Sequence, residues 1–298
     1  MKKSTLIFPA LFALAMLANG CSKRQPVVAT ATAIPKMATE EIHRTFQMRS
    51  NSSVGVDFFD GPVDVQTTDS DTAEVHIIRT TQYESDFKDE PIDRLEYEEY
   101  KGNNEEVKGH SFLNIRGRRI WGFELSKVWR LFKRKPEIRS QVTLKIPRKI
   151  SFIVVSDING DVNIGEVEGG VTVGDVNGKV AVARAERVLQ LISINGKVDA
   201  AIAKAQNKED DFLNLLYISG NIDLKFLDGI NATITGKKIN GQIANSLPNV
   251  SVKNDKNGNY NAVIGNGGVE IKFDKINGNT SLTPANNLAL ATVSQREK

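Results

Sequence analysis

The 298-residue sequence has one cysteine, three histidines and few aromatic residues, which make up 7% of the chain. A single cysteine excludes a disulfide within the chain. His43, His76 and His110 are scattered, and none has a cysteine, histidine or carboxylate at metal-ligand spacing, so we expect no metal and no cofactor. The sequence also lacks a Gly-Lys-Ser/Thr phosphate loop, a nucleophile elbow and a zinc-protease helix, and we therefore expect no enzymatic activity.

A long apolar segment is lacking as well. The apolar run of residues 6–17 is too short to cross a bilayer, which takes roughly 20 apolar residues. Lys2 and Lys3 precede the run and small residues follow it, which is the pattern of a secretory signal.

The signal ends in Leu17-Ala18-Asn19-Gly20-Cys21. This segment resembles the bacterial lipobox, although Ala18 stands where that pattern has leucine. The resemblance implies a signal peptide over residues 1–20 and lipid on Cys21. Because Ser22 rather than aspartate follows the cysteine, the resemblance also implies the outer membrane. An ordinary secretory signal with an incidental cysteine is the alternative.

Charge of one sign is not in excess in the mature chain. The 39 basic residues fall to 37 when Lys2 and Lys3 are removed with the signal, against 36 acidic residues. Overall charge therefore gives no support for nucleic acid binding.

The second half of the chain repeats one pattern: an apolar residue, Asn or Ser, Gly, a polar residue and alternating apolar residues. The six copies are centred on Gly160, Gly178, Gly196, Gly220, Gly241 and Gly278. Alternation of period two after each glycine predicts strands with one buried face, and the Asn-Gly pair predicts a corner. A nearly fixed period predicts stacked units, in which Asn159, Asn177 and Asn195 lie one above another.

We therefore predict an all-β fold: a single-stranded right-handed β-helix, or β-solenoid, of short repeats with Asn-Gly corners. An antiparallel β-sandwich or meander remains the alternative, because Asn-Gly between alternating apolar residues is also a hairpin signal.

The order of these motifs resembles the bacterial putative-adhesin family of β-strand-repeat proteins. The matching motifs are residues 60–65 (Asp-Gly-Pro-Val-Asp-Val), residues 144–147 (Leu-Lys-Ile-Pro) and the six repeats, which together span most of residues 45–283. The resemblance implies a β-helix or a related roll and binding at the cell envelope, and it supplies no catalytic residues.

The predicted organisation is a flexible tether over residues 21–42, a repeat domain over residues 43–285 and a polar tail over residues 286–298. Within the repeat domain, residues 84–136 form a charged insert with no counterpart in the family. Its end interleaves cations with both tryptophans, which suits anionic lipid or another polyanion. The candidate residues are Arg116, Arg118, Arg119, Trp121, Trp129, Arg130, Lys133, Arg134 and Lys135. Pairing with the acidic residues 84–106 is the structural alternative.

The leading functional hypothesis is a non-catalytic, lipid-anchored envelope protein that binds a glycan, another envelope protein or anionic lipid. A carbohydrate-active enzyme on a β-helix is a second hypothesis, for which Asp157 and Asp175 are one repeat apart and able to stack. A structural envelope scaffold is a third.

Overall fold

The computed structural model describes residues 36–49, 51–83, 94–99, 111–117, 137–203, 212–227, 230–254 and 259–285. The chain divides into Met1–Ile34, which lies wholly outside the described residues, and Pro35–Lys298, which holds every described strand. The predicted signal peptide, Cys21 and the polar tail 286–298 therefore fall outside the described residues. Every regular element that is described is a β-strand, so the all-β prediction is confirmed.

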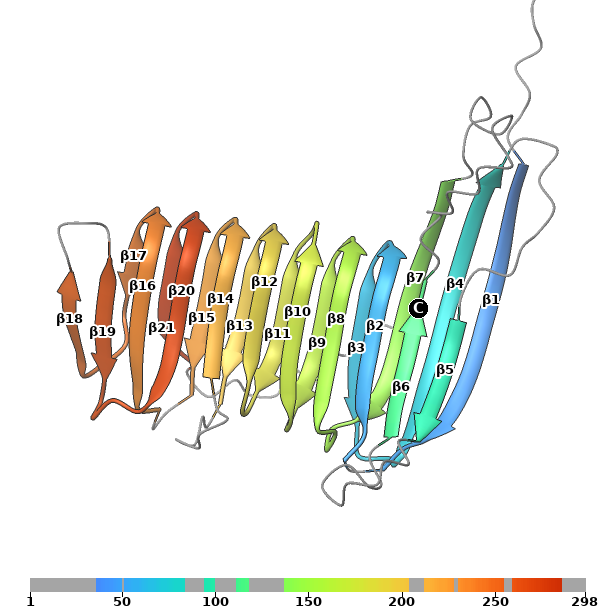
Figure 1. Ribbon diagram of the computed structural model, residues 1–298, viewed down its shortest axis with the longest axis horizontal. Coiled ribbons are helices and arrows are strands. Elements are labelled where there is room, and N and C mark those ends of the chain that lie inside the picture. The colour runs from blue at the N-terminus through green and yellow to red at the C-terminus, as the bar shows by residue number, and fades with distance from the viewer. Residues whose placement is uncertain are drawn as a thin grey trace, which may run out of the picture. The chain divides into compact units, whose positions relative to one another are not determined.

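The described strands form two mixed sheets, which we name sheet A and sheet B (Figure 1). In spatial order sheet A consists of β1 (Lys36–Gln47), β4 (Thr72–Tyr83), β7 (Glu137–Pro147), β3 (Val63–Thr68), β9 (Val162–Val167), β11 (Val180–Ala185), β13 (Val198–Ile202), β15 (Ile222–Phe226), β21 (Thr280–Pro284) and β17 (Ile243–Asn245).

Sheet B faces sheet A across the core. In the opposite spatial direction it consists of β18 (Val250–Asn254), β19 (Tyr260–Ile264), β16 (Ala232–Asn240), β20 (Val269–Asn277), β14 (Phe212–Ser219), β12 (Leu189–Asn195), β10 (Gly170–Val176), β8 (Phe152–Asn159), β2 (Ser53–Asp60), β6 (Ser111–Arg116) and β5 (Arg94–Glu99).

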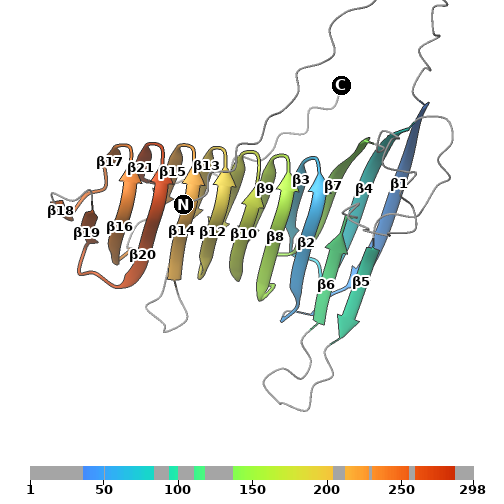
Figure 2. The same ribbon diagram turned by 45° about the horizontal axis from the view of Figure 1, so that its top comes forward.

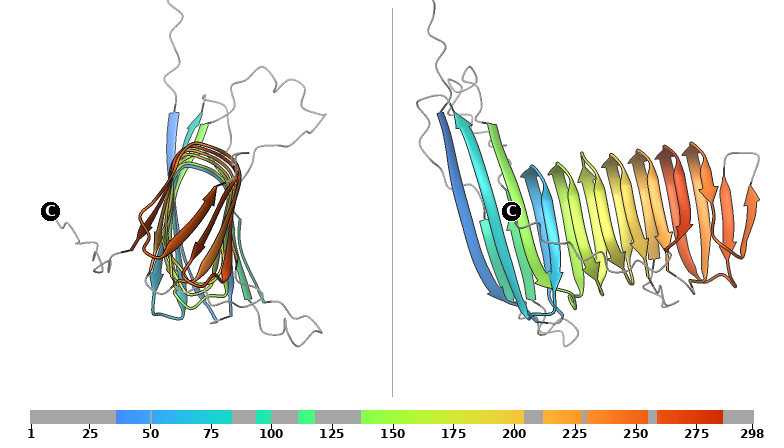
Figure 3. Two further views of the ribbon diagram at one scale, coloured as in Figure 1. Left: turned by 90° about the vertical axis from the view of Figure 1, so that its left-hand side faces the viewer. Right: turned by 180° about the vertical axis from the view of Figure 1, so that it is seen from behind.

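The central strands pair in parallel, while sheet B has antiparallel pairs at both ends and sheet A has them only at its β1 end. Strand β10 pairs with β8 and β12, and β11 pairs with β9 and β13, all in parallel. Because β8 to β15 alternate between sheets B and A, each strand lies beside the strand two elements away in sequence rather than beside the next one (Figure 2). Seen end-on, the two sheets form two walls (Figure 3).

The core fills the space between the walls with aliphatic side chains. In β12, Leu189, Leu191 and Ile194 are fully buried, whereas Gln190 and Ile192 between them lie on the outer face. The same alternation recurs in β8, β10, β14 and β15, as expected for strands with one buried face. These repeat positions therefore stack on their equivalents in neighbouring strands.

The repeat glycines form a column in which each backbone lies directly on the next. A Cβ added to Gly178 would lie 2.3 Å from the carbonyl oxygen of Gly160, and a Cβ on Gly196 would lie 2.1 Å from that of Gly178. Glycine is thus required at this position because two backbones approach closely.

The left-handed backbone conformation lies three residues before the glycine, which the sequence did not predict. Asp157, Asp175, Ser193 and Tyr217 have φ values of 55°, 51°, 58° and 59°. These residues interrupt the pairing just before the corner without shifting its register, since Gly174 pairs with Ile192 and Val176 pairs with Ile194 while the residues between them are skipped on both strands. The bend therefore depends on a left-handed residue within each strand as well as on the Asn-Gly pair.

The asparagine ladder is confirmed. The side-chain amide of Asn177 donates to Asn159 at 3.0 Å, and that of Asn195 donates to Asn177 at 3.0 Å. Asn159 continues the ladder to Asp60.

The spatial order of the repeats differs from their sequence order. Strand β20, which carries the sixth copy, lies between β14 and β16, which carry the fourth and fifth. At the other end β2 lies between β6 and β8. Copies with the same pattern have equivalent backbone hydrogen-bonding edges. The pattern therefore does not determine which copies become neighbours in a sheet.

Strands also lie within the predicted tether and within the predicted charged insert. Residues 36–42 of the predicted tether belong to strand β1, where Ile42 is opposite Ile77 and packs against the core. The predicted charged insert contains β5 and β6, and Leu113 and Ile115 of β6 are fully buried in the core. Period-two apolar positions within a charged segment are sufficient to form a core strand.

Candidate functional site

Arg116 is the only residue of the predicted cationic and aromatic surface that the structure describes; Cys21, Arg118, Arg119, Trp121, Trp129, Arg130, Lys133, Arg134 and Lys135 lie outside the described residues. The Arg116 guanidinium binds the Asp57 carboxylate on the neighbouring strand, with Nε–Oδ1 and Nη2–Oδ2 distances of 3.0 and 2.9 Å. It also lies over the Phe58 ring, 5.4 Å from its centroid. At this position the cation is held by Asp57 of the fold, which lies outside the acidic residues 84–106.

Asp157 on β8 and Asp175 on β10 occupy equivalent positions, and both have the left-handed backbone conformation. Asp175 is exposed and Asp157 is partly buried. Among the described residues, no group of three or more His, Cys, Asp or Glu side chains lies close enough together to hold a metal ion.

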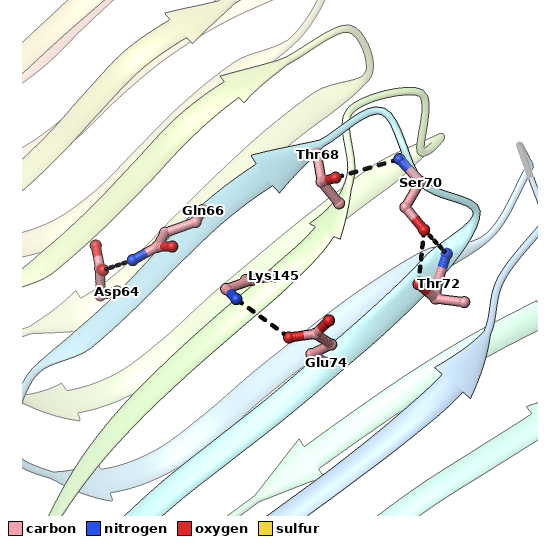
Figure 4. Close-up of polar contacts among 7 residues, drawn as sticks. All are labelled: Asp64, Gln66, Thr68, Ser70, Thr72, Glu74 and Lys145. Atoms are coloured by element: carbon pink, nitrogen blue, oxygen red, sulfur yellow. Dashed lines mark hydrogen bonds and ion pairs between the residues drawn. The ribbon is translucent and has the colours of Figure 1, made fainter. Parts of the chain in front are cut away.

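The outer face of sheet A is polar, and its side chains contact one another beside the β3–β4 turn. Lys145 on β7 binds Glu74 on β4 at 3.2 Å, and Gln66 donates to Asp64 at 2.8 Å within β3 (Figure 4).

The turn that joins β3 to β4 is held by hydroxyl groups beside these pairs. The amide of Ser70 donates to Thr68 Oγ1 at 3.2 Å, and the Ser70 and Thr72 hydroxyls lie 2.7 Å apart (Figure 4). The polar side chains here satisfy each other within the fold.

A second charged cluster lies further along sheet A. Asp199 on β13 is directly opposite Asp223 on β15, which would be unfavourable if neither had a counter-ion. Lys197 binds Asp223 at 2.7 Å and Lys225 binds Asp199 at 2.8 Å, so each carboxylate has its own cation. The hydrogen bond and the charge of Asp223 raise the pKa of the Lys197 ammonium above its ordinary value.

The outer face of sheet B carries an aromatic row instead. Phe112 on β6 and Phe152 on β8 flank Ser53, and Phe212 on β14 takes the equivalent position further along the stack. Phe112 and Phe212 are 39% and 37% exposed, and Phe152 is partly buried. Strands in a sheet are about 4.8 Å apart, so the Phe112 and Phe152 positions are separated by about 10 Å.

Two of these rings cover glycines on the neighbouring strand. A Cβ on Gly55 would lie 2.8 Å from Cζ of Phe112, and a Cβ on Gly170 would lie 2.2 Å from Cε2 of Phe152. Each ring therefore rests across the adjacent backbone, which fixes its position before a ligand arrives.

A row of amides and hydroxyls runs beside the aromatic row, two residues further along the strands. Thr172, Gln190 and Asn214 occupy this row on β10, β12 and β14, and all three are half-buried. Thr172 donates to Gln190 at 3.4 Å, and the remaining polar atoms of the row face outward.

At the centre of this face, the outward-facing positions that precede the left-handed residue of each strand carry no charged side chain. These positions on β8, β10, β12 and β14 are Phe152, Val154, Ser156, Gly170, Thr172, Gly174, Gln190, Ile192, Phe212, Asn214 and Leu216. The face can stack on flat apolar groups and hydrogen-bond to neutral polar groups. The nearest charges on β20 are Glu270 and Lys272, which lie opposite Phe212 and Asn214 and pair with each other.

Sequence reasoning missed this surface. Phe112, Phe152 and Phe212 lie far apart in the chain and belong to no shared motif, so the pairing register alone brings them into one row. No local sequence signal marks the row, because each phenylalanine stands alone in its own segment of the chain.

The described part of the chain contains no helix with the length and apolarity needed to cross a bilayer. No protein-family model matches the chain, and no curated protein sequence matches it.

Two solved structures share low similarity with the chain. One is a "putative cell adhesion protein" from Clostridium sporogenes ATCC 15579, at 12% identity and a TM-score of 0.38, covering 84% of this chain and 100% of that one. The other is a "putative adhesin" from Bacteroides fragilis NCTC 9343, at 11% identity and a TM-score of 0.28, covering 82% of this chain and 97% of that one. Likeness at this level does not assign a function.

Proposed function

We propose that this chain is a non-catalytic, adhesin-like binding protein of the bacterial cell envelope, and that it binds an uncharged glycan along the outer face of sheet B. The observation that carries the proposal is the uncharged centre of that face, where an aromatic row lies beside a row of amides and hydroxyls. Aromatic rings stack on the apolar faces of sugar rings, and amides and hydroxyls hydrogen-bond to sugar hydroxyl groups.

The scaffold we propose for this face is a right-handed β-helix. Strands that alternate between the sheets and pair in parallel with an equivalent strand 18 residues away support a chain wound in coils. An antiparallel sandwich would instead place strands adjacent in sequence side by side in one sheet, and among the described strands only β5 with β6 and β18 with β19 do so. The right hand follows from the general preference of parallel crossover connections.

We also propose that the protein is anchored in the outer membrane by lipid on Cys21. The lipobox resemblance at residues 17–21 supports this anchor. Several acyl chains on the processed cysteine would give stable attachment, whereas one chain is marginal. A Cys21→Ala variant released from the membrane fraction, with acylation found by mass spectrometry only in the unmutated chain, is the expected result.

The glycan proposal is tested by affinity electrophoresis of the purified chain through gels that contain soluble neutral glucan, mannan or galactan. We expect retardation by at least one neutral polysaccharide. Phe212→Ala should weaken that binding about 2- to 13-fold, because one stacked aromatic ring contributes about 0.5–1.5 kcal/mol. Met37→Ala is the matched control, since Met37 is 68% exposed but lies on β1 in sheet A.

Three outcomes would contradict the proposal. Retardation only by anionic polysaccharide would show that charge dominates binding. Equal retardation of the Phe212→Ala and unmutated chains would exclude the aromatic row. Release of new reducing ends from a bound glycan would show that the protein is an enzyme, which is the second hypothesis.

A further inference from the structure

Strand β1 is the terminal strand of sheet A and the longest terminal strand in the described part of the chain. It spans 12 residues and pairs on one side with β4 in an antiparallel register. The other described terminal strands, β17, β18 and β5, span three, five and six residues. Short strands blunt a sheet edge, whereas a long one presents a row of backbone donors and acceptors to another strand.

The ionisable side chains near the centre of β1 change from acidic to basic at Ile42. Glu40 and Glu41 precede Ile42, and His43 and Arg44 follow it. Glu41 and His43 lie on the outer face of sheet A, since His43 is opposite the outward-facing His76. Glu40, Ile42 and Arg44 lie on the other face, where Ile42 meets the core.

We propose that two copies of this chain associate through β1, as an antiparallel pair about a two-fold axis at Ile42. In this register Glu41 of each copy is opposite His43 of the other, and Glu40 is opposite Arg44. Sheet A then continues across the interface as one sheet, and the contact is identical for both copies.

Charge complementarity selects this register over its neighbours. Centring the pair on Glu41 places two glutamates opposite each other, and centring it on Arg44 opposes two arginines. Centring it on His43 opposes two histidines and leaves both glutamates opposite Thr45 and Phe46. Only the axis at Ile42 places an acid opposite a basic side chain on both faces.

The acidic side chains are accessible for this role although each already has a partner in its own chain. Glu41 binds His76 at 2.7 Å with its side chain 69% exposed, and Glu40 binds Arg79 with its side chain 50% exposed. A carboxylate accepts several hydrogen bonds, so a second donor from another copy can be accommodated.

Disulfide cross-linking in membranes of cells that express the full chain tests the register. Thr39 and Thr45 are exposed and would be opposite each other across the two-fold axis. Within one chain they are about 20 Å apart along the strand, which is too far for a disulfide. We expect the Thr39→Cys/Thr45→Cys double variant to form an oxidised species of twice the monomer mass.

Each single variant is a matched control, because its cysteines would be about 20 Å apart in the dimer. An Arg44→Glu change in the double-variant background should lower the cross-linked fraction about tenfold, because two cross-strand pairs change from attraction to repulsion. Equal dimer formation by the single and double variants would overturn the proposal. A cross-linked product of another mass would assign this edge to a different protein and would equally overturn it.

Discussion

The glycine column makes a quantitative prediction about stability, for which the chain supplies its own control. Gly174 and Gly178 belong to the same repeat and are four residues apart. A Cβ on Gly178 would lie 2.3 Å from the carbonyl oxygen of Gly160 and 2.5 Å from its carbonyl carbon. A Cβ on Gly174 would have one neighbour within 4 Å, the Ile192 oxygen at 3.8 Å.

Gly178→Ala should therefore force two backbones apart by about 1 Å, since ordinary carbon contacts begin near 3.4 Å. The backbone hydrogen bonds that join these repeats, such as Asn177 N to Ile158 O at 2.9 Å, would lengthen in response. Overpacking costs roughly 1–3 kcal/mol and each weakened hydrogen bond adds up to about 1 kcal/mol, so we expect a loss of about 2–4 kcal/mol. Gly174→Ala should change stability by less than about 1 kcal/mol and in the favourable direction, because alanine restricts the unfolded chain.

Urea unfolding of the two variants and the unmutated chain, followed by far-ultraviolet circular dichroism, measures the difference through the unfolding midpoint at a common slope. The test is which of the two variants has the lower unfolding midpoint. If Gly178→Ala is no less stable than Gly174→Ala, the glycine column does not depend on close backbone contact, and this account of the repeat is wrong.

Three further predictions concern the ion pair, the ladder and the core. Asp223 raises the pKa of Lys197 above 10.5, so the stabilisation is complete below that pH and is lost as the pH rises through the folded pKa. Asp223→Asn should therefore lower the unfolding midpoint at pH values below 10.5 and make its decline above that pH smaller, and an unchanged alkaline decline would contradict this reasoning. Asn177→Ala removes two ladder hydrogen bonds of 3.0 Å and should cost about 1–2 kcal/mol in urea unfolding, whereas an unchanged midpoint would mean that the exposed ladder contributes nothing. Leu191→Ala removes a fully buried side chain and should cost about 2–5 kcal/mol, and a loss below 1 kcal/mol would contradict the tight packing of the core.

The candidate binding surface was largely beyond sequence reasoning. The cationic and aromatic residues 116–135 were the local signal, and the one that is described, Arg116, is engaged with Asp57. The row of Phe112, Phe152 and Phe212 has no local signal, because each residue is an unremarkable aromatic at the start of its own strand. A surface built across strands is specified by their pairing, which depends on contacts between distant segments.

The sequence by itself determined the local structure. Alternation of apolar residues set which side chains are buried, as with Leu189, Leu191 and Ile194, since successive side chains of a strand point to opposite faces. The repeated Asn-Gly pairs set the position of the corners and of the ladder through Asn159, Asn177 and Asn195. These features follow from a few neighbouring residues and their repetition.

Only the tertiary structure decided the order in which the repeats stack. Strand β20 lies between β14 and β16, and the core strand β6 arises from a segment dominated by charge. The left-handed position is occupied by residues as different as Asp157, Ser193 and Tyr217, so no residue type marks it in the sequence. Repeats with equivalent apolar faces and backbone edges pair almost equally well with one another, and their order is therefore fixed by how the whole chain closes the ends of both sheets.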